Sequence, residues 1–120
     1  MNVDIKIYPA KNGDCFLVSF GEKAAEKMHL LIDCAYVDTF QKYLKDDLIK
    51  IGKSGGALEK LILTHIDADH IQGAIRLLKD NNTEKFIAIK EVWHNTYRHL
   101  CVQKGGEISV KQERILQQII

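Results

Sequence analysis

Four side chains that can bind a metal ion stand within six consecutive residues of this sequence: His65, Asp67, Asp69 and His70. They follow an apolar run at positions 61–63, and Gly73 comes three residues after the last of them. Imidazole and carboxylate groups crowded at the end of a buried strand are costly unless a positive charge lies among them. Nitrogen and oxygen ligands of this kind suit zinc, manganese or iron. The cluster therefore predicts a metal site.

The spacing of these residues suggests two metals rather than one. His65 and Asp67 are two positions apart, so an extended backbone would point both side chains the same way. Asp69 and His70 are adjacent, where the chain is expected to turn into a helix. Two metals about 3.5–4 Å apart commonly activate water against a phosphoryl or acyl centre. In the simplest alternative, Asp69 caps the helix and the histidines are surface residues, which explains only one of the four groups.

The segments before this cluster predict a sheet. Residues 3–7 alternate apolar and polar side chains, which indicates a half-buried strand, and residues 11–14 contain an Asn-Gly turn. Residues 15–20 and 29–34 read as two further strands, completing a three-stranded meander. Asp33 ends the third strand. It is either a turn acid or a carboxylate that supports the site from a neighbouring strand.

A helix and a buried strand are expected to lead into the cluster. Apolar residues from Val37 to Ile51 recur at three- and four-residue spacing, with Asp38 as a possible capping residue and Gly52 as a C-cap. The strand that follows reaches position 63, and strand–helix–strand order favours a parallel crossover. A second helix is expected over 71–78, a fifth strand over 87–93 and a last helix over 109–120. The predicted class is α/β, with layered α+β character.

Bulk properties narrow the function classes. The 120 residues suffice for one compact domain, and the net charge of +1 indicates no strong footprint for nucleic acid or membrane, although a local basic patch would not alter it. No stretch approaches the roughly 18 apolar residues that span a bilayer. The three cysteines, Cys15, Cys34 and Cys101, form no C-x-x-C pair. Because the charged first residues do not resemble a signal peptide either, we expect reduced thiols in a cytoplasmic protein.

The cluster also resembles a known motif. Residues 64–70, Thr-His-Ile-Asp-Ala-Asp-His, with Gly73 after them, are similar to the T-H-x-H-x-D-H-x-x-G signature of the metallo-β-lactamase superfamily of metallohydrolases. The resemblance covers about residues 3–93 and implies the N-terminal half of the αββα sandwich of that family. Gly13 and Asp14 in the first hairpin further resemble the ComEC-like hydrolase domains linked to DNA uptake.

The resemblance implies a role for each residue. His65 would bind a first metal, and Asp69 and His70 a second, with Asp69 also orienting the attacking water as the catalytic residue. Asp67 stands where the family usually has histidine, giving H-x-D-x-D-H, as in its di-iron flavoprotein branch. A carboxylate there makes the first site harder, so zinc is expected but manganese and iron gain preference. Asp33 would orient a ligand imidazole from behind.

The resemblance also shows what the chain lacks. The family completes its sites with a later histidine, a bridging aspartate and a final histidine. Here the only later histidines are His94, which comes early for that role, and His99, and no aspartate follows Asp80. The chain is therefore expected to be a single-domain N-terminal fragment of a larger domain, inactive alone. Its uncovered sheet would be covered by a missing C-terminal half or by a second copy in a homodimer.

Three functional hypotheses remain. The first is a metal-dependent hydrolase acting on a small-molecule ester, an amide or a phosphodiester, with phosphodiesters and thus nucleic acid favoured by the ComEC-like resemblance. The second is a non-catalytic association module that retains the metal motif. The third is a redox di-iron protein, suggested by Asp67, which would need an electron donor.

Overall fold

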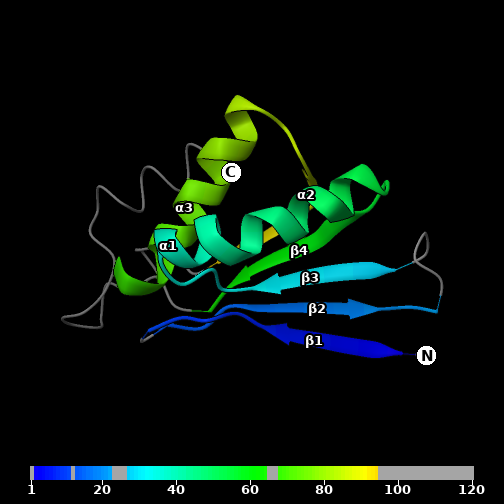
Figure 1. The fold of residues 1–120 in the computed structure, drawn as a ribbon, viewed down its shortest axis with the longest axis horizontal. Coiled ribbons are helices and arrows are strands. Elements are labelled where there is room, and N and C mark those ends of the chain that lie inside the picture. Colours follow the sequence, from blue (N-terminus) through cyan, green and yellow to red (C-terminus); the bar gives the residue numbers. More distant parts are fainter. Residues whose placement is uncertain (1, 12, 23–26, 65–67, 95–120) are drawn as a thin grey trace.

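The protein is described here by a computed structural model covering residues 2–11, 13–22, 27–64 and 68–94, without the side chains of residues 68–70. Within these ranges six strands form one mixed sheet: β1 (Val3–Ile7), β2 (Phe16–Phe20), β3 (Met28–Ile32), β4 (Ala57–Leu63), β5 (Ala88–Ile89) and β6 (Val92–His94). β1, β2 and β3 pair antiparallel, as the predicted meander requires. β4 pairs parallel with β3, which confirms the predicted crossover, and also with β5 and β6. The predicted α/β class is confirmed (Figure 1).

The crossover between β3 and β4 is one helical stretch with a π-helical centre. It comprises α1 (Val37–Thr39), η2 (Phe40–Leu44) and α2 (Lys45–Lys53). The predicted capping by Asp38 is wrong, because Tyr36 occupies the N-cap and no side chain bonds there. The predicted C-cap at Gly52 is also wrong, since α2 continues to Lys53. Gly52 instead allows close packing, because a Cβ there would lie 1.9 Å from the carbonyl oxygen of Phe86.

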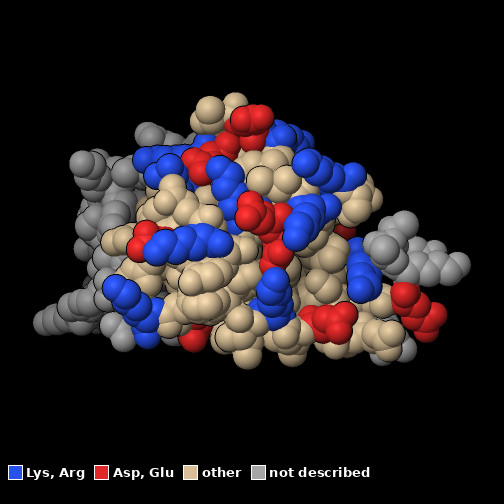
Figure 2. Space-filling model, viewed as in Figure 1, with Lys and Arg blue, Asp and Glu red and all other residues tan. Residues whose placement is uncertain are grey.

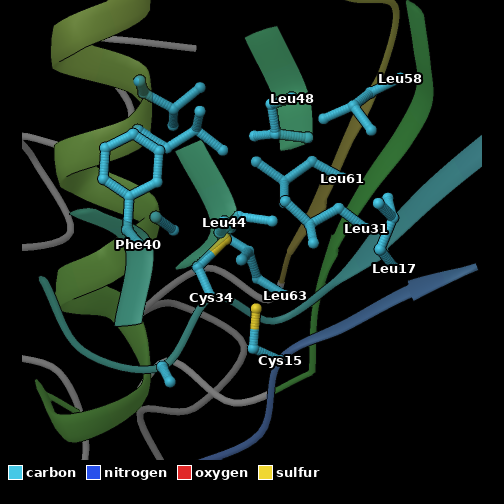
Figure 3. Packing of buried hydrophobic residues seen from close by; sticks show 14 of the residues in the cluster. Cys15, Leu17, Leu31, Cys34, Phe40, Leu44, Leu48, Leu58, Leu61 and Leu63 are labelled. Atoms are coloured by element: carbon cyan, nitrogen blue, oxygen red, sulfur yellow. The ribbon is translucent and has the colours of Figure 1, made fainter. Parts of the chain in front are cut away.

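The core lies between one sheet face and the helices. Leu17, Leu31 and Leu61 are paired across three neighbouring strands and are buried side by side, because paired residues point to the same face of a sheet. Figure 3 shows them facing Leu44 and Leu48 of the helical crossover. α3 (Ala68–Thr83), the predicted second helix, adds its own apolar residues to this cluster. The apolar faces of the strands and of the helices thus pack against each other in one core layer.

The opposite face of the sheet carries apolar side chains with less cover. In β1, Val3, Ile5 and Ile7 are 58%, 62% and 69% exposed. The register continues their row across the sheet, since Ile5 pairs with Val18 and Val18 with Leu30. The three helical segments labelled in Figure 1 lie to one side of the strands. An apolar sheet face of this kind is where a second layer normally packs.

The predicted fifth strand is divided. β5 and β6 are separated by Lys90 and Glu91, and both pair with β4 at different positions. The turn from α3 into β5 is held by Asn81, whose amide oxygen accepts hydrogen bonds from the N–H groups of Phe86 and Ile87 at 3.0 and 3.2 Å. The helix predicted over 109–120 lies outside the described residues.

The surface matches the balanced composition. Figure 2 shows lysine and arginine side chains interspersed with aspartate and glutamate over the face in view, with no broad region of one sign. None of the described helices has the length and apolar character needed to cross a membrane.

Candidate metal centre

The predicted metal-binding cluster spans the connection between β4 and α3. β4 ends at Leu63 and α3 begins at Ala68, so this connection leaves the carboxyl end of a parallel strand. His65 and Asp67 lie outside the described residues. The backbone of Asp69 and His70 belongs to the first turn of α3, as expected, and their side chains lie outside the description. The four ligand assignments therefore stay predictions, while the elements predicted on either side of them are confirmed.

Asp33 is tied to the residue that begins the motif. Its side chain is buried, and its carboxylate accepts hydrogen bonds from both the backbone N–H of Thr64, at 2.8 Å, and the Thr64 hydroxyl. The Asp33 N–H donates to the carbonyl oxygen of Ile62 at 2.8 Å, which extends the β3–β4 pairing by one residue. Within the described part of the chain, Asp33 thus anchors the exit of β4. Its predicted contact with a ligand imidazole stays a prediction.

The backbone around Asp33 is unusual. Asp33 and Ala35 both have left-handed conformations, with φ of 57° and 53°. Aspartate tolerates this region better than most residues, whereas alanine pays a steric cost there. The bend turns the chain from β3 into α1 and brings the carbonyl groups of residues 34–36 against α3. The strand-end acid and this bend are therefore one local structure.

Gly73 packs directly on that bend. Its N–H donates to the carbonyl oxygen of Ala35 at 2.9 Å. A Cβ at this position would lie 2.3 Å from the carbonyl oxygen of Cys34 and 2.9 Å from that of Tyr36. Because glycine has no Cβ, it allows this close backbone approach. Through it, the first turns of α3 are seated on the end of β3, so Asp33 and Gly73 position the two ends of the motif.

Two buried thiols lie beneath this edge. Cys15 and Cys34 are unpaired and almost fully buried, and Figure 3 shows their sulfur atoms facing the same region of the core. Burial, with the nearby negative charge of Asp33 adding to it, raises the pKa of Cys15 to about 12. Burial likewise raises the pKa of Cys34. Both thiols are therefore protonated at neutral pH, which makes them weak nucleophiles.

The two histidines outside the motif that the structure describes lie at opposite ends of the sheet. His29, at the start of β3, shares a 2.7 Å hydrogen bond with Ser19 and so lies far along the strand from Asp33. His94 ends β6 and is in register with Leu63, next to Thr64. From the sequence, His94 comes early for the family's third histidine; the parallel pairing of β4 with β6 places it at the same edge of the sheet as Thr64. Among the side chains described, no three of His, Cys, Asp and Glu gather as a metal site.

The donor set itself fits a divalent metal. Two imidazoles and two carboxylates start from one connection, whose ends are fixed by the Asp33–Thr64 hydrogen bonds and by the contact at Gly73. Nitrogen and oxygen donors match zinc, manganese or iron, and rigid supports around ligands are typical of metal sites. Four groups suffice for a partial pair of sites, and two complete sites need more donors.

Comparison with known proteins agrees with the geometry. The sequence profile of the metallo-beta-lactamase superfamily matches residues 9–109. Neither a curated protein nor a solved structure gave a match. The profile covers most of the chain, including β2, β3, the crossover helix and the whole motif, and the mixed sheet agrees with part of that fold. On this basis the chain belongs to the metallo-beta-lactamase superfamily.

Proposed function

We propose that this chain is a metal-dependent hydrolase in which a dinuclear site activates water. His65 and Asp67 would bind one metal, and Asp69 and His70 the other. The bound metals would supply Lewis-acid activation, lowering the pKa of water so that it attacks at neutral pH. Asp69 would also orient the attacking water through a hydrogen bond. The family assignment supports the reaction class, since its members are typically metal-dependent hydrolases.

One observation carries the proposal to this particular site. The buried carboxylate of Asp33 holds Thr64, the first residue of the motif, at the carboxyl edge of parallel strands. Binding sites in α/β sheets form at such edges, because the connections leaving the strands converge there. Burying a carboxylate costs free energy, so a buried aspartate that only fixes the end of a strand is unexpected unless the position of that end matters. Its position favours a functional connection over a simple loop.

The substrate we favour is a phosphodiester, supported by the ComEC-like resemblance of Gly13 and Asp14 in the first hairpin. The metal we favour is zinc, with manganese or iron as alternatives because Asp67 is a carboxylate. A cytoplasmic location is supported by the free thiols of Cys15 and Cys34.

We further propose that this chain is one part of the complete site. No aspartate follows Asp80, so the bridging carboxylate of the family has no counterpart in the printed sequence. The missing ligands would come from a C-terminal half of the same domain or from a second copy. The exposed apolar row of Val3, Ile5 and Ile7 supports either arrangement, because both would cover it.

The test measures metal content and hydrolysis together. The 120-residue chain, and any longer protein that contains it, would be purified without chelator and analysed for zinc, manganese and iron. We expect bound metal in both, at least tenfold lower occupancy in Asp69→Asn and His70→Ala, and unchanged occupancy in Asp46→Asn, an exposed control on α2. Hydrolysis of bis(p-nitrophenyl) phosphate should require the longer protein or the dimer. A longer protein without metal and without activity on phosphodiesters or thioesters would sink the proposal.

A second candidate is a non-catalytic association module, favoured by the same exposed sheet face. In that case, the motif would bind metal weakly or not at all, and the chain would act by covering its apolar face with a partner. Sedimentation equilibrium of the wild type and of an Ile5→Lys variant tests association directly. Self-association that is lost in Ile5→Lys, in a protein with neither bound metal nor phosphodiesterase activity, would favour this role over the enzyme.

A further inference from the structure

A recess lies between the segment that follows β1, the start of the helical crossover and α3. It has a volume of about 710 Å³, within the range of small-molecule sites. Its lining comes from residues 9–11 after β1, from the segment 36–43 that contains α1 and most of η2, and from Gln72 of α3. Tyr36 of the wall follows the Asp33 bend by three residues, and Gln72 precedes Gly73 on α3. The recess is therefore built on the same backbone that positions the motif.

The wall of the recess is held in place by two contacts from the first hairpin. The hydroxyl of Thr39, buried in α1, donates to the carbonyl oxygen of Pro9 at 2.9 Å. The buried Tyr8 donates its hydroxyl to Asp47 of α2 at 2.6 Å. Because both contacts join the hairpin to the helical crossover, the recess is a preformed feature of the fold. Preformed recesses bind with less loss of conformational freedom.

Charged side chains around the recess are positive on balance. Lys11 and Lys42 line it with a single acid, Asp38. Lys6, by contrast, pairs with Asp47 at 2.6 Å and Lys90 with Glu59 at 2.8 Å. Within the described residues neither Lys11 nor Lys42 has such a carboxylate partner. Their ammonium groups are therefore available to an anionic ligand, for which lysine is a common phosphate-binding residue.

Two tyrosines complete the lining. Tyr43 is 46% exposed and Tyr36 is partly buried, and both border the recess. Neither hydroxyl has a hydrogen-bond partner among the described side chains. Aromatic rings at a partly open surface bind planar groups by stacking, as in proteins that bind single-stranded nucleic acids. Two lysines with no carboxylate partner among the described residues, beside one exposed ring and one partly buried ring, match a ligand that combines a phosphate with a planar ring.

We propose that this recess binds the nucleoside phosphate portion of the substrate, with Lys11 and Lys42 contacting the phosphate and Tyr36 and Tyr43 packing against the base. Its role as a substrate site rests on the proposed phosphodiesterase function, whereas binding of the ligand does not. The recess would hold the nucleotide next to the bond to be cleaved at the motif. Substrates that carry a base would then be bound more tightly than small phosphodiesters.

The test uses the 120-residue chain with Asp69→Asn, treated with chelator so that the result is independent of metal and catalysis. Binding of AMP, adenosine and inorganic phosphate is measured by calorimetry. AMP should bind at least tenfold more tightly than either of the others, and added salt should weaken it. Lys11→Met and Lys42→Met should each weaken AMP binding about tenfold. Tyr43→Leu should weaken AMP but not phosphate, and Lys50→Met on α2 serves as the matched control.

Two outcomes would overturn the inference. One is the absence of AMP binding at millimolar concentration by a chain whose circular dichroism is that of the wild type. The other is equal binding of AMP by Lys11→Met, Lys42→Met and Lys50→Met. Because the test measures binding and not hydrolysis, its result can be interpreted even if the hydrolase proposal is wrong. Tighter AMP binding that is lost only in the recess variants would support it.

Discussion

The carboxylate of Asp33 accepts two hydrogen bonds from a single residue, Thr64, which stands 31 positions later at the exit of the neighbouring parallel strand. One bond comes from the backbone N–H and one from the hydroxyl, so both carboxylate oxygens are used. This pair joins the ends of β3 and β4 where the candidate ligands begin. The stability of this edge and the affinity for metal should therefore respond together when the pair is changed.

Replacing Asp33 tests that coupling. Asp33→Ala leaves the Thr64 N–H without its acceptor and should cost about 2–4 kcal/mol of unfolding free energy. Asp33→Asn should cost less, about 1 kcal/mol, because asparagine keeps one carbonyl oxygen and also tolerates the left-handed φ of 57°. Urea denaturation measures both, with Asp46→Asn as a control expected within about 0.5 kcal/mol of wild type. Equal losses for alanine and asparagine would contradict the assigned hydrogen bonds.

Gly73→Ala should disrupt the contact between α3 and the bend after β3. The added Cβ would lie 2.3 Å from the carbonyl oxygen of Cys34, and backbone on both sides leaves it little room to move. We expect a loss of at least about 2 kcal/mol, although alanine is the better helix former by nearly 1 kcal/mol. Thermal denaturation compares it with Lys79→Ala, a change on the same helix that should have little effect. A stabilised Gly73→Ala protein would show that the close approach is not present.

The buried thiols should resist labelling. Cys15 and Cys34 are 1% and 0% exposed, and burial raises the pKa of both. The substitution Cys101→Ser leaves these two as the only thiols of the printed sequence. Ellman's reagent should therefore react with neither on the time scale of minutes in native buffer, and with both once guanidinium unfolds the chain. Fast labelling of either thiol in a chain with native circular dichroism would refute this packing.

His29 should make the fold sensitive to mild acid. Burial, with a smaller contribution from the positive charge of Lys27, lowers the pKa of His29 below its ordinary value of about 6.5. The unfolded chain then takes up this proton at higher pH than the folded chain, so stability is lost as pH falls through that ordinary value. His29→Gln should flatten this part of the profile between pH 7 and 5. Urea midpoints across that range measure it, and parallel wild-type and variant profiles would exclude the contribution.

Local periodicity was enough to predict most of the fold. The alternation at Val3, Ile5 and Ile7 and the helical stripe beginning at Val37 depend on neighbours in sequence, and both elements are present. Gly52 was misjudged because its role depends on Phe86, a contact between distant segments. The hydrogen bonds that Asn81 accepts from the segment before β5 were not predicted for the same reason. An asparagine at a helix end is common, and its partners can be identified only once the position of β5 is known.

The candidate site likewise has features that could be predicted from local sequence and features that depend on contacts between distant residues. The type and spacing of His65 and Asp69 suggested metal from the sequence alone, and the interest of Asp33 came from a single acid ending an apolar run. What could not be foreseen was that Asp33 would be joined to Thr64, since hydrogen-bond partners 31 residues apart depend on strand register. The place of His94 beside Leu63 was equally hidden, because it follows from parallel pairing of a short sixth strand.

The outermost strand, β1, has consequences for aggregation. Its apolar residues face the exposed side of the sheet, while Asp4 and Lys6 alternate with them, and Lys6 is held by Asp47 of α2. Charged side chains on an edge strand discourage the addition of further strands, which is how fibrils grow. The exposed apolar face of the sheet favours packing against a second copy, whereas the charged edge of β1 disfavours the addition of another strand. At high concentration, copies of this chain should therefore form closed dimers and not open-ended filaments.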